Sequence, residues 1–178
     1  MTRLTPVDPA RATGKAKELF DGPLKGKHLN IFKGMANSPA ALQACLSLTG
    51  ALGDGLLSAK EREVVQLAVG EANGCEYCTA AHTMTGVKAG LTDEQAAGAR
   101  RGSIPDDPKL DAIARFAVTL YEKKGWVSDD DLKRIRDAGY TDGHIAEIIA
   151  NFALATYTNY FNHVNQTDVD FPAAPTLG

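Results

Sequence analysis

The stretch that decides the fold runs from residue 63 to residue 82 and reads EVVQLAVGEANGCEYCTAAH. Its first half carries a dense series of valine, leucine and alanine that suits a buried helix, and Asn73-Gly74 then ends that helix. A second helix is expected from Cys75 to Ala89, with Gly90 as the residue that stops it. The stretch therefore predicts a helical hairpin with two cysteines at the start of its second arm.

Capping residues and glycines divide the rest of the chain into further helices, and no segment alternates apolar and polar residues as a strand would. Ser58 begins the first arm of the hairpin, because Glu61 follows it with the spacing of a capping box. The other expected helices cover residues 9–20, 30–36, 39–52, 92–102, 109–123, 128–138 and 142–165. The predicted fold class is all-α.

Length and composition favour one domain. The chain has 178 residues and is 44% hydrophobic, which is enough for one sizeable core. We expect a single domain over residues 1–178, with its core in residues 39–165 and an extended C-terminal arm in residues 166–178. The 19 basic and 22 acidic side chains give a net charge of -3, which offers no broad attraction for nucleic acid or anionic lipid.

The compartment follows from what the sequence does not contain. The start of the chain has no signal-peptide pattern, and no run of about 20 residues is free of charge, so no membrane association is expected. Three cysteines, an odd number in a chain of this size, argue against a secreted disulfide scaffold. The expected location is the cytoplasm.

Cys75, Cys78 and His82 are separated by three and four residues, so on one helix they share a face. A thiol reacts as the thiolate, which both the positive end of the helix dipole and a nearby imidazole favour. Two cysteines at this separation allow a redox cycle: one is oxidised to sulfenic acid and the other condenses with it into a disulfide. The dipole alone favours Cys75, which lies nearer the helix start, as the attacking thiol.

Glu63 lies about three turns before the end of the first arm. If the chain reverses at Asn73-Gly74, Glu63 can reach the middle of the second arm near His82, where it would hold a proton or orient the imidazole. Glu71 and Glu76 are alternative carboxylates, but both are expected to be solvated. The candidate catalytic residues are therefore Cys75, Cys78, His82 and Glu63.

Two other interpretations concern metal and the third cysteine. The pattern Cys-x-x-Cys-x-x-x-His supplies three ligands, whereas structural zinc takes four, so His144 or His163 would have to complete the set. We expect no metal and no cofactor. Cys45 lies on the apolar stripe of the helix over residues 39–52 and is expected to be a buried small hydrophobe.

At these residues the sequence resembles the alkyl hydroperoxidase D (AhpD)-like family, within the wider carboxymuconolactone decarboxylase-like superfamily. The resemblance rests on three segments: Ala59-Lys-Glu-Arg-Glu63, Asn73-Gly-Cys-Glu-Tyr-Cys78 and Ala80-Ala-His82. It implies an all-helical bundle with a central hairpin that carries the cysteine pair. It also implies assembly as a homo-oligomer, a trimer or hexamer, and a peroxidase activity driven by the dithiol.

In that family a glutamate, two cysteines and a histidine form a proton relay, which maps onto Glu63, Cys75, Cys78 and His82. The second cysteine usually attacks the peroxide, which would assign the attack to Cys78. The dipole argument favours Cys75, so the order of the two thiols stays open. The best-known members also carry a second histidine between the cysteines. This chain has Tyr77 there, which cannot relay protons near neutral pH as imidazole does.

Three functions fit these residues. The first is a thiol-dependent peroxidase that reduces a hydroperoxide with a thiol or dithiol reductant, which in the best-known members is lipoyl-linked. The second is a cofactor-free decarboxylase of the same superfamily, although those relatives generally lack the cysteine pair. The third is a non-enzymatic redox sensor, although a disulfide between adjacent turns constrains little beyond its own helix. The sequence favours the peroxidase.

Overall fold

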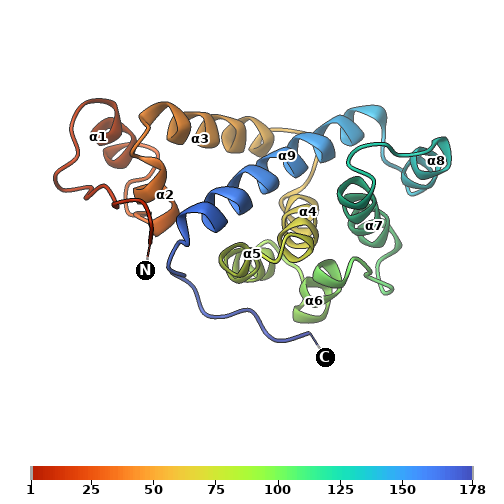
Figure 1. Ribbon diagram of the computed structural model, residues 1–178. Coiled ribbons are helices and arrows are strands. Elements are labelled where there is room, and N and C mark those ends of the chain that lie inside the picture. The colour runs from red at the N-terminus through yellow and green to blue at the C-terminus, as the bar shows by residue number, and fades with distance from the viewer. Residues whose placement is uncertain (1, 178) are drawn as a thin grey trace.

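The computed structural model describes residues 2–177, which form nine helices and no strand. The all-α prediction is therefore confirmed. In these residues no helix combines the length and the apolar character needed to cross a bilayer. The helices, shown in Figure 1, are α1 (Gly14–Asp21), α2 (Asn30–Met35), α3 (Pro39–Gly53), α4 (Ala59–Ala72), α5 (Glu76–Lys88), α6 (Asp93–Arg101), α7 (Pro108–Glu122), α8 (Asp129–Asp137) and α9 (Asp142–Asn165).

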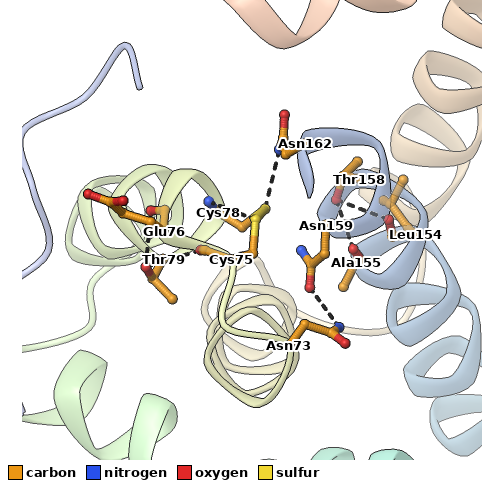
Figure 2. The surroundings of a disulfide bond; sticks show 10 residues. All are labelled: Asn73, Cys75, Glu76, Cys78, Thr79, Leu154, Ala155, Thr158, Asn159 and Asn162. Atoms are coloured by element: carbon orange, nitrogen blue, oxygen red, sulfur yellow. Dashed lines mark hydrogen bonds between the residues drawn. A yellow bond between two sulfur atoms is a disulfide. The ribbon is translucent and has the colours of Figure 1, made fainter. Parts of the chain in front are cut away.

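The long helix α9 crosses the molecule, with α1, α2 and α3 towards one end and α7 and α8 towards the other (Figure 1). Two buried hydrophobic clusters lie along it. One is built mainly from α4, α6, α7 and α9, and the other from α1, α2, α3 and the start of α5. Ile148 and Ala155 of α9 belong to the first cluster and Leu154 belongs to the second. Helix α9 therefore joins the two clusters and faces the start of α5 (Figure 2).

Eight of the nine helices begin and end within one residue of the expected positions, because their caps are local. The first helix was predicted to begin at residue 9, which is wrong, since α1 begins at Gly14. Asp8 accepts backbone hydrogen bonds from Ala10 and Arg11, which closes a turn there instead. Gly14 has a φ of 52°, a left-handed conformation that separates this turn from the helix. Residues 12–36 supply buried side chains, so the core also extends towards the N-terminus beyond residue 39.

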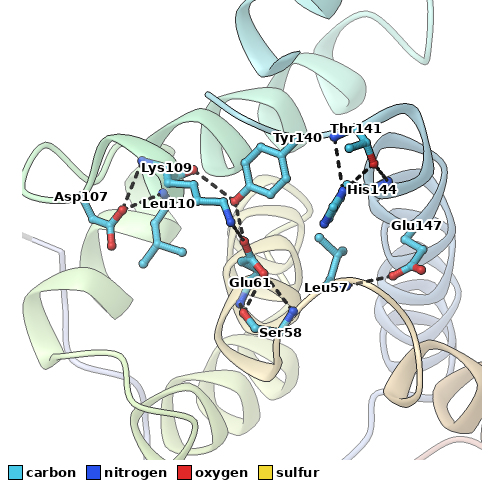
Figure 3. A network of polar contacts seen from close by, with 10 residues as sticks. All are labelled: Leu57, Ser58, Glu61, Asp107, Lys109, Leu110, Tyr140, Thr141, His144 and Glu147. Carbon is cyan, nitrogen blue, oxygen red and sulfur yellow. Dashed lines mark hydrogen bonds and ion pairs between the residues drawn. The ribbon is translucent and has the colours of Figure 1, made fainter. Parts of the chain in front are cut away.

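The capping box at the start of α4 is confirmed and belongs to a larger network (Figure 3). The Glu61 carboxylate accepts from the backbone N–H and the hydroxyl of Ser58, from the Tyr140 hydroxyl at 2.9 Å, and pairs with Lys109 at 3.1 Å. Burial acts to raise the pKa of Glu61, but these hydrogen bonds outweigh it and lower the pKa to about 2. The network fixes the start of α4 against α7 and against Tyr140, which lies between α8 and α9.

Candidate dithiol site

The turn between α4 and α5 places the two cysteines. Gly74 has a φ of 65°, which a glycine adopts without strain, and the N–H of Cys75 donates to the Gly70 carbonyl at 2.9 Å. This reverses the chain so that α5 packs along α4, as the hairpin interpretation predicts. The start of α5 then points at the inner face of α9 (Figure 2).

Cys75 and Cys78 are joined by a disulfide, with their Cα atoms 5.3 Å apart. Cys75 is the N-cap of α5 rather than its first helical residue, and its sulfur accepts from the backbone N–H of Cys78 at 3.3 Å. Their exposed fractions are 1% and 2%. A sulfur at this position receives the partial positive charge of the helix start, so the local geometry favours an ionised Cys75 thiol.

The hydrogen-bond donor to Cys78 comes from α9 and was missed by sequence reasoning. The Nδ2 of Asn162 lies 3.4 Å from the Cys78 sulfur (Figure 2). One turn earlier, Asn159 accepts from the Asn73 side chain at 2.9 Å, which ties α9 to the hairpin turn. The signal in the sequence was the series of asparagines at positions 151, 159, 162 and 165, which recur at helical spacing and are all buried.

Glu63 and His82 meet on the two arms of the hairpin. The His82 Nδ1 lies 2.7 Å from the Glu63 Oε2, and the Thr85 hydroxyl donates to the same oxygen at 2.7 Å. Burial acts to raise the pKa of Glu63, but the charge of His82 and these hydrogen bonds outweigh it and lower the pKa. Glu63 is therefore a carboxylate at neutral pH and can accept a hydrogen bond from Nδ1–H of His82. In that tautomer, Nε2 is the ring nitrogen that can accept a proton.

His82 lies one helical turn beyond Cys78 on α5. The structure thus brings Glu63 to His82 and brings Cys75 to Cys78, while Asn162 rather than His82 donates to the Cys78 sulfur. The alternative carboxylates lie elsewhere: Glu71 forms an ion pair with Arg100 at 2.7 Å, and Glu76 is exposed.

Tyr77 fastens the C-terminal arm across the start of α5. Its hydroxyl donates to the Asp170 carboxylate at 2.6 Å, and its ring packs edge-to-face on Phe171. Asp170 also accepts from the backbone N–H of Asn30 at 2.8 Å. Burial and the adjacent Asp170 carboxylate raise the pKa of Tyr77, so the phenol remains a proton donor at all physiological pH values. Tyr77 therefore holds the arm and cannot act as a base.

Two hollows flank Cys75 beneath this arm. One measures about 310 Å³ and is bordered by Asn162, Thr167 and Val169, and the other measures about 260 Å³ and is bordered by Arg100, Ala173 and Ala174. Gly74, Cys75 and Glu76 line both, and Cys78 lines neither. In this disulfide form, a molecule that follows either hollow therefore meets Cys75 first.

The remaining candidates have other surroundings. Cys45 is buried on α3 with an exposed fraction of 4%, and burial raises the pKa of its thiol, so the prediction of a small buried hydrophobe is confirmed. Within residues 2–177, no group of three or more histidine, cysteine, aspartate or glutamate side chains could hold a metal ion.

Comparison with known proteins finds a family similarity over this site. The carboxymuconolactone decarboxylase family model matches residues 39–119, which include both arms of the hairpin. No curated protein matches the chain.

Three solved structures share the fold over nearly the whole chain. An alkylhydroperoxidase AhpD core, peroxidase-related protein from Ralstonia eutropha is 24% identical with a TM-score of 0.82, and the match covers 95% of this chain and 92% of that one. A peroxidase-related protein from Silicibacter is 21% identical with a TM-score of 0.77, and the match covers 94% of each chain. The debrominase Bmp8, in complex with 2,3,4-tribromopyrrole, is 16% identical with a TM-score of 0.79, covering 96% of this chain and 92% of that one.

At these identities the structures establish the fold, and the family match lies over the hairpin that carries the cysteine pair. The chain therefore has the fold of these AhpD-like and peroxidase-related structures, and its residues 39–119 are similar to the carboxymuconolactone decarboxylase family.

Proposed function

We propose that this protein is a thiol-dependent peroxidase that reduces a hydroperoxide to an alcohol and water. The observation that carries the proposal is the Cys75–Cys78 disulfide at the start of α5, one turn from an imidazole held by a partly buried carboxylate. A dithiol that closes into a disulfide supplies the two electrons that cleavage of an O–O bond requires. The Glu63–His82 pair supplies the proton transfers.

In the reduced protein, His82 Nε2 takes the proton of the Cys78 thiol, and Glu63 stabilises the imidazolium through Nδ1–H. The Cys78 thiolate attacks one peroxide oxygen, a sulfur–oxygen bond forms and the O–O bond breaks. The alkoxide leaves with the proton from His82, and Cys78 is left as a sulfenic acid. The Cys75 thiol then attacks the Cys78 sulfur and the hydroxyl leaves as water, which closes the disulfide. Two equivalents of a reductant thiol, or one dithiol, reopen it.

The test is peroxide consumption with dithiothreitol as reductant by the wild type, Cys75→Ser and Cys78→Ser, with the intact mass of each protein recorded after exposure. Cys45→Ala is the matched control, since Cys45 is buried in another helix. We expect wild type and Cys45→Ala to turn over and to lose two mass units on oxidation, and both serine variants to stop. Equal inertness of the wild type and the serine variants, with no oxidation of the pair, would overturn the proposal.

A cofactor-free decarboxylase is the second candidate. It is favoured by the Glu63–His82 pair itself, which is an acid–base unit that needs no cysteine, and by the family match over residues 39–119. The disulfide favours the peroxidase, because acid–base decarboxylation has no use for a redox pair. Decarboxylation of a γ-lactone acid that persists after both cysteines are replaced by serine would select this second function.

We also propose a homo-oligomer in a reducing compartment such as the cytoplasm, where small thiols are plentiful. Helix α9 presents exposed apolar side chains on one face, at Ile149, Tyr157, Tyr160 and Val164. A trimer or hexamer would cover this face. Light scattering of the purified protein measures the mass of the assembly. Val164→Asp should lower that mass, and a monomeric wild type would refute the proposed homo-oligomer.

A further inference from the structure

Asn162 has a buried side-chain amide, and only one of its two polar atoms has a hydrogen-bond partner among the described residues. Its exposed fraction is 4%, its Nδ2 donates to the Cys78 sulfur at 3.4 Å, and its Oδ1 has no hydrogen-bond partner among the described residues. Its neighbour Asn159 is equally buried but bonds to the Asn73 side chain, so it serves the hairpin turn (Figure 2). Burying an amide costs free energy unless its polar atoms find partners. The hydrogen bond to the Cys78 sulfur is therefore the contact that offsets the cost of burying the Asn162 side chain.

The amide contact depends on the redox state of the sulfur. A disulfide sulfur and a thiolate both accept hydrogen bonds, but the thiolate carries a full negative charge and is bound more strongly by an N–H donor. An N–H donor therefore stabilises the thiolate relative to both the disulfide and the neutral thiol. We propose that Asn162 is a catalytic residue of the dithiol, which binds and stabilises the Cys78 thiolate through its Nδ2–H.

This inference rests on the proposed redox cycle and gives Asn162 a role in the half of the cycle in which the disulfide is reduced. A reductant thiolate that follows either hollow reaches the Cys75 sulfur and forms a new S–S bond to it. The Cys75–Cys78 bond breaks, and its electron pair leaves on Cys78 as the thiolate that Asn162 binds. A second reductant thiolate attacks the reductant sulfur of the mixed disulfide, which frees Cys75 and releases the oxidised reductant.

Each sulfur then has a separate donor. Cys75 is served by the backbone N–H at the start of α5, and Cys78 by the side chain of Asn162 from α9. The helix dipole favours a thiolate at Cys75, whereas the proposed attack on peroxide needs a thiolate at Cys78. The two are compatible, because the Asn162 side chain can stabilise a Cys78 thiolate independently of the helix start. The unpartnered Oδ1 of the same amide also offers an acceptor for the hydroxyl of a Cys78 sulfenic acid.

The test measures thiolate formation without peroxide. In a Cys75→Ser background, Cys78 is the site thiol, and its alkylation by iodoacetamide is followed from pH 5 to 10, with peptide mapping to separate it from buried Cys45. Adding Asn162→Leu should slow Cys78 alkylation about tenfold at neutral pH and move the midpoint of the profile to higher pH. Asn151→Leu, which replaces a buried amide of the same helix whose Nδ2 donates to the Glu147 carbonyl, is the matched control and should leave the profile in place.

Circular dichroism checks that each variant folds. If leucine does not fit at position 162, Asn162→Ala removes the same amide with a smaller side chain and should shift the alkylation profile in the same direction. A profile identical to that of the Cys75→Ser parent in a folded Asn162 variant overturns the role of Asn162. Because alkylation involves no hydroperoxide, that result is independent of whether the wild type has peroxidase activity. Absence of turnover in the wild type would instead overturn the peroxidase proposal and leave the thiol profile to be judged separately.

Discussion

The His82 Nδ1 lies 2.7 Å from the Glu63 Oε2, although the two residues are 19 positions apart and come from opposite arms of the α4–α5 hairpin. The carboxylate fixes both the orientation and the tautomer of the imidazole, because it accepts the hydrogen of Nδ1. Thr85 binds the same oxygen from the next turn of α5 and completes the arrangement. The acid–base part of the site is thus contained within the hairpin.

Glu63→Gln tests this relationship. The glutamine side chain has nearly the same shape but carries no charge, so it cannot stabilise the imidazolium that forms when His82 takes a proton. We expect peroxide turnover to fall on the order of a hundredfold, within the usual range for losing acid–base assistance. Steady-state kinetics from pH 5 to 9 would measure it. Glu122→Gln, at an exposed site on α7, is the control, and wild-type kinetics in Glu63→Gln would remove Glu63 from the proposed relay.

Tyr77→Phe tests whether the arm limits access to Cys75. The substitution removes the hydroxyl that donates to Asp170 and keeps the ring that packs on Phe171. A hydrogen bond to a carboxylate contributes roughly 1.5–3 kcal/mol, so the arm should open on the order of tenfold more often.

The measurement is the rate at which excess thiol reduces the Cys75–Cys78 disulfide, compared between dithiothreitol and the bulkier glutathione. If opening of the arm is the rate-limiting step, reduction by glutathione should be about tenfold faster in Tyr77→Phe than in the wild type. Tyr121→Phe, on the exposed side of α7, should reduce at the wild-type rate. Equal rates in Tyr77→Phe and wild type would show that reductants reach Cys75 with the arm in place.

Local chemistry explains which parts of this site the sequence could predict. The hairpin and the Glu63–His82 contact follow from residues 58–90, because a capping box, a left-handed glycine and helical spacing are all local features. Asn162 is 84 positions from Cys78, and Asp170 is 93 positions from Tyr77, so these contacts depend on how α9 and the arm pack. The first helix was placed too early because the turn at Asp8 competes with helix formation.

The pH dependence of stability tests the Glu61 network. The pKa of Glu61 is lowered from 4.5 to about 2, so its contribution to folding is complete above pH 4.5 and is lost as the pH falls towards 2. Glu61→Gln removes the charge that Lys109 and Tyr140 contact, and leaves a buried side chain with poorer partners. We expect it to lower the free energy of unfolding by about 1–3 kcal/mol at pH 7.

Because protonation removes the same charge from the wild type, the stability gap between wild type and Glu61→Gln should narrow steadily between pH 4.5 and pH 2. Urea unfolding at pH 7, 4 and 3 measures this gap, and Glu94→Gln, an exposed carboxylate on α6, should show no comparable pH-dependent difference. A gap that stays constant over this range would mean that the Glu61 charge does not stabilise the fold. The start of α4 would then be held by the shape of the capping box and by its hydrophobic packing.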